Sequence, residues 1–167
     1  MRKVSAGIAT SVFFFLAPGM VAGLVPWLIT HWRFQRSSWD PVPLRWLGAA
    51  LIVIGVIALV ECFARFAVRG RGTPAPVLPT EVLVVSGLYR YVRNPMYVDV
   101  LAIVFGQALL FGSKGALIYA ACVWLACTLF VVLYEEPTLR RRYGEQYNTY
   151  CRHVRRWIPR LTPWRSS

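Results

Sequence analysis

Four long runs with almost no charged residues constrain the fold of this chain more than any other feature. The first lies within residues 4–30 and carries no charge at all. It therefore exceeds the roughly 20 residues that a helix needs to cross a bilayer. Three further runs follow at residues 46–64, 95–112 and 116–134. The sequence thus predicts an all-α integral membrane protein with four transmembrane helices.

The composition supports this fold class. Apolar residues make up 57% of the chain and charged residues only 16%, whereas soluble domains carry about 25% charged residues. A basic start followed by an apolar run is also compatible with a signal peptide. The first run is longer than the usual h-region of about 7–15 residues, so we expect a retained helix. Its Gly19 and Gly23, near Pro18 and Pro26, fit either a close, kinked helix contact or small residues tolerated in lipid.

Turn and tail residues predict how the last elements are arranged. The tight turn at residues 111–115 contains two glycines, so the third and fourth runs should form a helical hairpin. The fourth run then ends abruptly at Glu135-Glu136-Pro137. Beyond it, apolar residues recur every three or four positions, which predicts an amphipathic helix at the cytoplasmic membrane interface. These residues are Leu139, Tyr143, Tyr147, Tyr150 and Val154.

The uneven distribution of positive charge predicts the topology. The net charge is +12, and 15 of the 19 Lys and Arg residues lie in the N-terminus, the connection at residues 65–94 and the tail. Such a bias is typical of cytoplasmic segments. We therefore expect both termini in the cytoplasm, in a multi-pass protein of a bacterial inner membrane that contacts membrane lipids. No recognition motif accompanies the charge, which argues against a nucleic-acid partner.

Two polar clusters are predicted to form a site. Residues 87–97 read Gly-Leu-Tyr-Arg-Tyr-Val-Arg-Asn-Pro-Met-Tyr, at the entrance of an apolar run where polar groups are costly unless they bind something. A charged, aromatic membrane boundary would also explain the arginines. The hairpin would place this stretch beside Glu135 and Glu136. Together they would form a pocket for a ligand that carries both signs of charge.

Other polar residues leave their roles open. Glu61 lies inside the second run, where an acid is either functional or paired with Arg65 four residues later. Asp99 in the third run could orient an acceptor or Arg93, or bond a neighbouring helix. The chain has two histidines and four cysteines without Cys-x-x-Cys spacing, so no metal site is expected.

The two clusters resemble a known enzyme group. Gly87-Leu-Tyr-Arg-x-x-Arg-Asn-Pro-x-Tyr97 is followed about forty residues later by Glu135-Glu-x-x-Leu-x-x-x-Tyr-Gly-x-x-Tyr-x-x-Tyr150. This pattern resembles the isoprenylcysteine carboxyl methyltransferase and phospholipid methyltransferase family of integral membrane methyltransferases. The resemblance covers residues 65–160, which would form the cofactor-binding core of a single domain spanning residues 1–167. Asn94 stands where carboxyl methyltransferases usually have His, so this side chain can hydrogen-bond but not titrate.

The resemblance implies transfer of a methyl group from S-adenosylmethionine to a lipophilic acceptor that enters from the bilayer. The acceptor could be a carboxylate, an amine or a thiol, and the oligomeric state is left open. Arg93 and Glu135 are the candidate catalytic residues. The candidate cofactor-binding residues are Gly87, Tyr89, Arg90, Arg93, Asn94, Pro95, Tyr97, Glu135 and Glu136.

Two alternatives compete with the methyltransferase hypothesis. Sterol and steroid reductases, which use NADPH, have a similar hairpin and a Tyr-rich tail ending in Ile-Pro, matched here by Tyr147, Tyr150, Cys151 and Ile158-Pro159. A non-catalytic scaffold would use the basic face only to hold anionic lipid. The scaffold would need no pairing between the two polar clusters.

Overall fold

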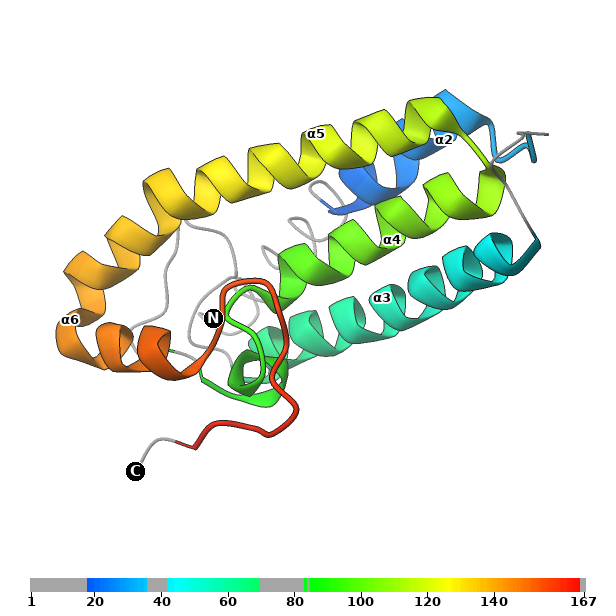
Figure 1. Ribbon diagram of the computed structural model, residues 1–167. Coiled ribbons are helices and arrows are strands. Elements are labelled where there is room, and N and C mark those ends of the chain that lie inside the picture. The colour runs from blue at the N-terminus through cyan, green and yellow to red at the C-terminus, as the bar shows by residue number, and fades with distance from the viewer. Residues whose placement is uncertain (1–17, 36–41, 70–82, 84, 166–167) are drawn as a thin grey trace, which may run out of the picture.

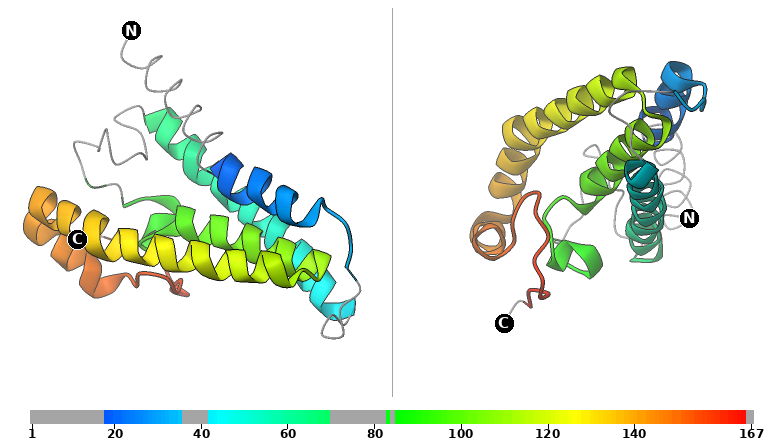
Figure 2. Two further views of the ribbon diagram at one scale, coloured as in Figure 1. Left: turned by 90° about the horizontal axis from the view of Figure 1, so that it is seen from above. Right: turned by 45° about the vertical axis from the view of Figure 1, so that its right-hand side comes forward.

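The computed structural model describes residues 18–35, 42–69, 83 and 85–165, and this part of the chain is helical and contains no strand (Figure 1). The helices are the π-turn η1 (Met20–Leu24), α2 (Val25–Thr30), α3 (Val42–Arg69), the 3-10 turn η2 (Gly87–Arg90), α4 (Pro95–Phe111), α5 (Lys114–Phe130), the π-turn η3 (Val131–Glu135) and α6 (Glu136–His153). Helices α3, α4 and α5 lie side by side, with α4 between the other two (Figures 1 and 2).

Two of the described helices, Val42–Arg65 and Lys114–His153, are long and apolar enough to cross a membrane. Met20–Thr30 and Pro95–Phe111 are apolar but shorter. Large apolar side chains are exposed on α3, such as Ile54 and Ile57, and on α5, such as Ile118. Such exposure suits a hydrocarbon surrounding better than water. The all-helical, apolar architecture is confirmed. The count of four spans stays a prediction, and most of the first run lies outside the described residues.

Glycines set the close approach of α3 to α4. A Cβ atom on Gly48 would lie 2.6 Å from the carbonyl oxygen of Gly106, and one on Gly106 would lie 2.7 Å from the carbonyl oxygen of Gly48. Gly55 approaches the backbone of Asp99 in the same way. Among the described residues the close contact considered for Gly23 is not formed, because a Cβ atom there would meet none of their atoms within 4 Å.

Replacing Gly106 with Ala is therefore expected to destabilise the protein by about 1–3 kcal/mol, because two backbones would have to separate. Thermal unfolding in detergent would measure the change. Gly23→Ala is the matched control, since the added methyl group meets open space, and it should leave the unfolding temperature unchanged or slightly raised. Equal effects of the two substitutions would contradict the close α3–α4 contact.

The predicted hairpin between α4 and α5 is confirmed. Gly112 ends α4 in the left-handed conformation (φ 64°), which glycine adopts without strain. Ser113 then caps α5, because its side-chain oxygen accepts a hydrogen bond from the Ala116 N–H at 3.3 Å. Pro95 begins α4, as its fixed φ and missing N–H favour. The start of α4 and the end of α5 consequently lie at the same end of the hairpin.

The helix does not end at residue 134, which corrects the sequence-based prediction. Pro137 cannot donate a backbone hydrogen bond, and the chain accommodates it with the π-turn η3, in which the Glu136 N–H bonds to the Val131 carbonyl. The helix then continues into α6. Gly144 has non-helical angles (φ 54°, ψ −126°) and kinks α6. The second half of α6 thereby runs back toward the start of α4 (Figure 1).

The apolar face predicted for α6 is confirmed, but it packs on the protein itself. Tyr147, Tyr150 and Val154 are buried together, and residues from α6 itself and from two other segments surround them. These neighbours are Leu83, Val85, Leu139, Tyr143, Cys151 and Trp164. The kink at Gly144 explains this result, because it turns the face inward.

Candidate functional site

The two polar clusters meet at the open end of the hairpin. The Tyr97 hydroxyl at the start of α4 donates a hydrogen bond to Glu135 Oε2 at 2.8 Å. Arg93 Nη1 lies 3.1 Å from Glu136 Oε1. Residues about forty positions apart are therefore in direct contact, as the hairpin prediction required.

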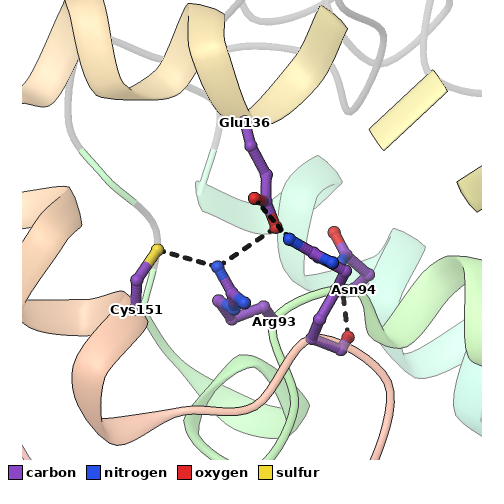
Figure 3. A network of polar contacts seen from close by, with 5 residues as sticks. Arg93, Asn94, Glu136 and Cys151 are labelled. Atoms are coloured by element: carbon purple, nitrogen blue, oxygen red, sulfur yellow. Dashed lines mark hydrogen bonds and ion pairs between the residues drawn. The ribbon is translucent and has the colours of Figure 1, made fainter. Parts of the chain in front are cut away.

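Glu136 is the centre of a buried ionic cluster (Figure 3). Its side chain is only 7% exposed, and Arg156 contacts it with two hydrogen bonds, Nε to Oε1 at 2.7 Å and Nη2 to Oε2 at 2.9 Å. Arg93 adds a second positive charge. Burial alone would raise the pKa of Glu136, but the Arg156 hydrogen bonds and both arginine charges outweigh it and hold this pKa below its usual range. Glu136 is therefore ionised at neutral pH.

Arg93 keeps one side-chain donor, Nε, that the described part of the protein does not use. Its Nη1 also donates to Cys151 Sγ at 2.8 Å (Figure 3), and its side chain is 11% exposed. Its Nε is buried, and within the described part of the chain it has no hydrogen-bond partner. A buried donor without a partner costs about 1–3 kcal/mol. An anionic group of a bound ligand would remove that cost.

Asn94 connects the motif at residues 87–97 to the C-terminal tail, the segment that follows α6 at residues 154–165. Its side chain is buried, and Nδ2 donates to the backbone carbonyl of Arg156 at 3.2 Å (Figure 3). The same residue of the tail thus contacts Glu136 through its side chain and Asn94 through its backbone. An amide suits this position because it donates at every pH, whereas an imidazole would donate or accept according to its tautomer.

The tail lies across the motif and is bonded to it by three backbone hydrogen bonds. The Arg93 N–H donates to the Arg155 carbonyl, the Arg160 N–H to the Tyr91 carbonyl, and the Trp164 N–H to the Arg90 carbonyl, each at 2.9 Å. These bonds resemble strand pairing without forming a strand. They fix the backbone of the segment that presents Arg93.

Two candidate residues contact the tail and α6. Arg90 Nε donates to the Trp164 carbonyl at 2.8 Å, and the Tyr89 carbonyl accepts from the Tyr150 hydroxyl at 2.6 Å. Gly87 has φ 58°, and a Cβ atom there would collide with the Arg65 side chain. Within the contacts described, these three residues shape the motif's backbone.

Sequence reasoning missed Arg156 and Cys151 as members of this cluster. Arg156 was one of many tail arginines, and its two-point contact with Glu136 follows no sequence spacing. Cys151 was noted only for its likeness to reductase tails. The apolar series Tyr147, Tyr150 and Val154 did contain a signal for these two residues. If that face of the tail helix packs inward, Cys151 and Arg156, which lie next to it in the sequence, must also lie near the core.

Acids elsewhere in the bundle have structural partners. The Cys62 thiol of α3 donates to Asp99 Oδ2 at 3.7 Å, so Asp99 bonds a neighbouring helix, one of the options considered. Glu61 forms an ion pair with Arg65, one of the two roles considered for it. Among the residues described, no group of three or more His, Cys, Asp and Glu side chains could hold a metal ion.

Comparison with known proteins gives a consistent family. The model of the family described as phospholipid methyltransferase matches residues 44–146, more than half of the chain. The phosphatidylethanolamine N-methyltransferase of Zygosaccharomyces rouxii is 33% identical over 89 residues, covering 53% of this chain and 10% of the relative. The enzyme of the same name from Talaromyces marneffei is 43% identical over 63 residues, covering 37% of this chain and 6% of the relative. The chain thus matches a tenth or less of the length of these relatives.

Proposed function

Because this chain belongs to the phospholipid methyltransferase family, we propose that it transfers a methyl group from S-adenosylmethionine to a phospholipid. The sequence pattern resembled both carboxyl and phospholipid methyltransferases, and the family match confirms the phospholipid methyltransferases. The proposed donor follows from the family, and the proposed acceptor class follows from the names of the family and of the two relatives. Both relatives are named for phosphatidylethanolamine, so we propose an amine-bearing headgroup as the acceptor.

The observation that carries this proposal is the contact between the two motifs. Arg93 forms an ion pair with Glu136, and Tyr97 contacts Glu135. Asn94 bonds the backbone of Arg156, whose side chain binds Glu136. S-adenosylmethionine carries a carboxylate, an ammonium and ribose hydroxyls, and therefore needs both donors and acceptors. The unpartnered Nε of Arg93 fits the carboxylate. The carboxylate of Glu135, the last residue of η3, fits the ammonium or the hydroxyls.

The proposed site keeps the residues expected from the sequence, with divided tasks. Arg93 would bind the cofactor carboxylate, and Glu136 would hold Arg93 in place. Glu135 would bind the cofactor's ammonium or ribose hydroxyls, and Tyr97, which contacts it, would line the pocket. The remaining members would shape the backbone around the cofactor; they are Gly87, Tyr89, Arg90, Asn94 and Pro95.

The bound cofactor would supply an activated methyl group on a positively charged sulfur. The protein's task is then mainly to hold the acceptor nitrogen, the methyl carbon and the sulfur in line and to exclude water. A segment fixed by three backbone bonds to the tail is suited to this task. The alignment would be set by backbone geometry as well as by side chains.

We further propose that four helices span the bilayer, with the site and both termini at the cytoplasmic face. The site lies at the end of the hairpin nearest the basic segments, which the positive-inside rule places in the cytoplasm. A phospholipid could then reach the site sideways, with its acyl chains in the bilayer and its headgroup beside Tyr97 and Glu135.

The family match favours the methyltransferase over the reductase alternative. The reductase signature rested on the hairpin and on Tyr147, Tyr150, Cys151 and Ile158-Pro159, and the first three of these residues have internal contacts here. Tyr147 and Tyr150 fill the cluster beneath the tail, and Cys151 accepts a hydrogen bond from Arg93. The scaffold alternative needs no contact between the two motifs, and that contact is present.

Calorimetric titration of the purified protein with S-adenosylmethionine tests this function. Parent protein should bind the cofactor, and Arg93→Ala should bind it at least about tenfold more weakly, because a charge-assisted hydrogen bond contributes about 1.5–3 kcal/mol. Arg152→Ala is the matched control, since Arg152 forms an ion pair with Glu145 in which both side chains are 70% exposed. It should bind like the parent.

Two results would contradict the proposal. One is absence of S-adenosylmethionine binding by a folded parent protein, particularly with NADPH binding in its place. The other is an Arg93→Ala variant that remains folded and binds S-adenosylmethionine as tightly as the parent. Thermal unfolding of each variant would establish that it is folded.

A further inference from the structure

One exposed face of α3 changes from apolar to charged toward the end of the helix, and α3 contacts η2. Ile54 and Ile57 on this face are 64% and 66% exposed. Glu61 and Arg65 follow four and eight residues beyond Ile57, a spacing that keeps them on the same face of a helix. A phospholipid has the same order of parts, because its apolar acyl chains end in a charged headgroup.

Arg65 has side-chain donors that the described part of the chain does not use. It forms an ion pair with Glu61 through Nε, and its side chain is 42% exposed. Among the described residues no other hydrogen bond or ion pair involves Arg65, so its Nη1 and Nη2 groups remain available. A guanidinium carries five N–H donors in a planar fork, which matches the oxygen atoms of a phosphate.

Arg65 lies directly against the start of η2. A Cβ atom on Gly87 would lie 2.5 Å from Arg65 Nε and 2.8 Å from its Cζ, so the guanidinium fills the space that a side chain would need. Tyr89 follows in the same turn. Burial raises the pKa of the Tyr89 hydroxyl, and the proximity of Cys62 on α3 and of Glu135 on η3 adds to the rise. The turn η2 therefore connects Arg65 with the proposed cofactor site.

Other polar atoms at this junction lack partners. Oε2 of Glu61 is buried, as is Oγ of Ser86, the residue before Gly87, and neither atom has a hydrogen-bond partner within the described part of the chain. Buried polar groups are almost always hydrogen-bonded in native proteins, so exceptions are expected where a polar ligand binds. A phosphoethanolamine headgroup carries phosphate oxygens, which accept from a hydroxyl, and an ammonium, which donates to a carboxylate.

We propose that Arg65 binds the phosphate of the acceptor phospholipid, whose acyl chain lies along the exposed apolar face of α3 at Ile54 and Ile57. The inference rests on the proposed function and adds to it the site that recognises the lipid. With the phosphate at Arg65, the amine of the headgroup extends along η2 toward the cofactor. A free phosphate ion would meet Arg65 but not the apolar face, so the occupant is a lipid.

Arg65→Ala tests this role in mixed detergent micelles in which the mole fraction of phosphatidylethanolamine is varied. The KM for the lipid should rise at least about tenfold, because a charge-assisted hydrogen bond is lost, and kcat should stay within about threefold of the parent. Arg65→Lys keeps the charge but loses the fork, so its KM should lie between these two values. Arg45→Ala, near the other end of α3, is the matched control and should keep the parent's KM.

A double variant separates the lost phosphate contact from the effect of an unpaired acid. Arg65→Ala also removes the ion-pair partner of Glu61, which could disturb the end of α3. Glu61→Gln combined with Arg65→Gln removes both charges and leaves no unpaired acid. Its KM for the lipid should be raised as much as that of Arg65→Ala. Thermal unfolding in detergent would establish that each variant is folded.

Two further readouts show which group Arg65 binds. Affinity for S-adenosylmethionine, measured by calorimetry, should stay within about threefold of the parent, because Arg65 contacts only the acceptor. Dioctanoyl phosphatidylglycerol, which has the phosphate but no amine, should inhibit the parent at concentrations at least about tenfold lower than those that inhibit Arg65→Ala. Dioctanoylglycerol, which lacks the phosphate, should not distinguish the two proteins, and inorganic phosphate at the same concentrations should inhibit neither.

Several results would overturn the inference while leaving the proposed function intact. One is a parent-like KM for the lipid in Arg65→Ala or in the double variant. Another is loss of S-adenosylmethionine affinity in a folded Arg65→Ala protein, which would assign Arg65 to the cofactor. A third is inhibition by phosphatidylglycerol that is absent or equal in the two proteins, or inhibition by inorganic phosphate alone. Failure of the parent to bind S-adenosylmethionine or to methylate lipid would instead contradict the proposed function.

Discussion

Replacing Glu136 with Gln is expected to destabilise the protein by about 3–5 kcal/mol, because removal of one partner leaves buried charge uncompensated. Arg93, with a side chain only 11% exposed, would lose its acidic partner. Arg156 would lose its acidic partner and keep the bond between its backbone carbonyl and Asn94. Cofactor affinity should fall as well, since Arg93 would no longer be held. Thermal unfolding in detergent and calorimetric titration would measure the two effects.

The matched control for this change is Glu145→Gln. Glu145 pairs with Arg152 at 3.3 Å, but both side chains are 70% exposed, and exposed pairs contribute at most about 1 kcal/mol. Its unfolding temperature should therefore stay close to that of the parent. If Glu136→Gln and Glu145→Gln lowered the unfolding temperature equally little, the buried ionic cluster would not stabilise the protein.

The same cluster predicts a pH dependence of stability. The folded-state pKa of Glu136 is lowered, so its contribution is fully present above its unfolded pKa of about 4.3. The contribution is lost as the pH falls through the lowered folded value. Glu136→Gln should remove this acid-dependent loss, and the difference in stability between parent and variant should shrink as the pH is lowered.

Removing residues 155–167 is the second change with a large expected effect. The three backbone hydrogen bonds to Arg90, Tyr91 and Arg93 would be lost, at about 0.5–1.5 kcal/mol each, together with the Arg156 contacts. Backbone amides of residues 88–93 should then exchange hydrogen much faster. S-adenosylmethionine binding should be weakened strongly, because the segment that presents Arg93 would no longer be fixed.

Leu161→Ala distinguishes the tail's backbone from its side chains. Leu161 is 100% exposed, and substitution of such a residue usually changes stability by less than about 0.5 kcal/mol. Its hydrogen-exchange pattern should match the parent. Unchanged protection of residues 88–93 in the truncated protein would show that the tail does not hold the motif.

The elements that sequence analysis predicted correctly are those set by local chemistry. Pro95 begins a helix because its φ is fixed, and Gly112 with Ser113 makes the hairpin turn. The hairpin in turn brought residues 93–97 to Glu135 and Glu136. Apolar periodicity also identified the buried face of α6, although its partner is the protein rather than the bilayer surface.

What could not be predicted depends on contacts without a sequence period. The tail's hydrogen bonds are made by backbone atoms, which every residue has, so no pattern marks Arg155 or Arg160. The choice of Gly48 and Gly106 as the close contact depends on how α3 and α4 cross. The different chemistry of Glu135 and Glu136 arises from which partner each meets, and neighbouring identical residues cannot reveal it.

Methyl transfer by the purified protein in phosphatidylethanolamine vesicles tests the central claim most directly. The protein would be supplied with S-adenosylmethionine carrying a deuterated methyl group, and the lipids would be examined by mass spectrometry. The proposed function predicts that deuterated methyl groups appear on the headgroup nitrogen with parent protein and are nearly absent with Arg93→Ala. Folded parent protein that binds S-adenosylmethionine but leaves every lipid unlabelled would contradict it.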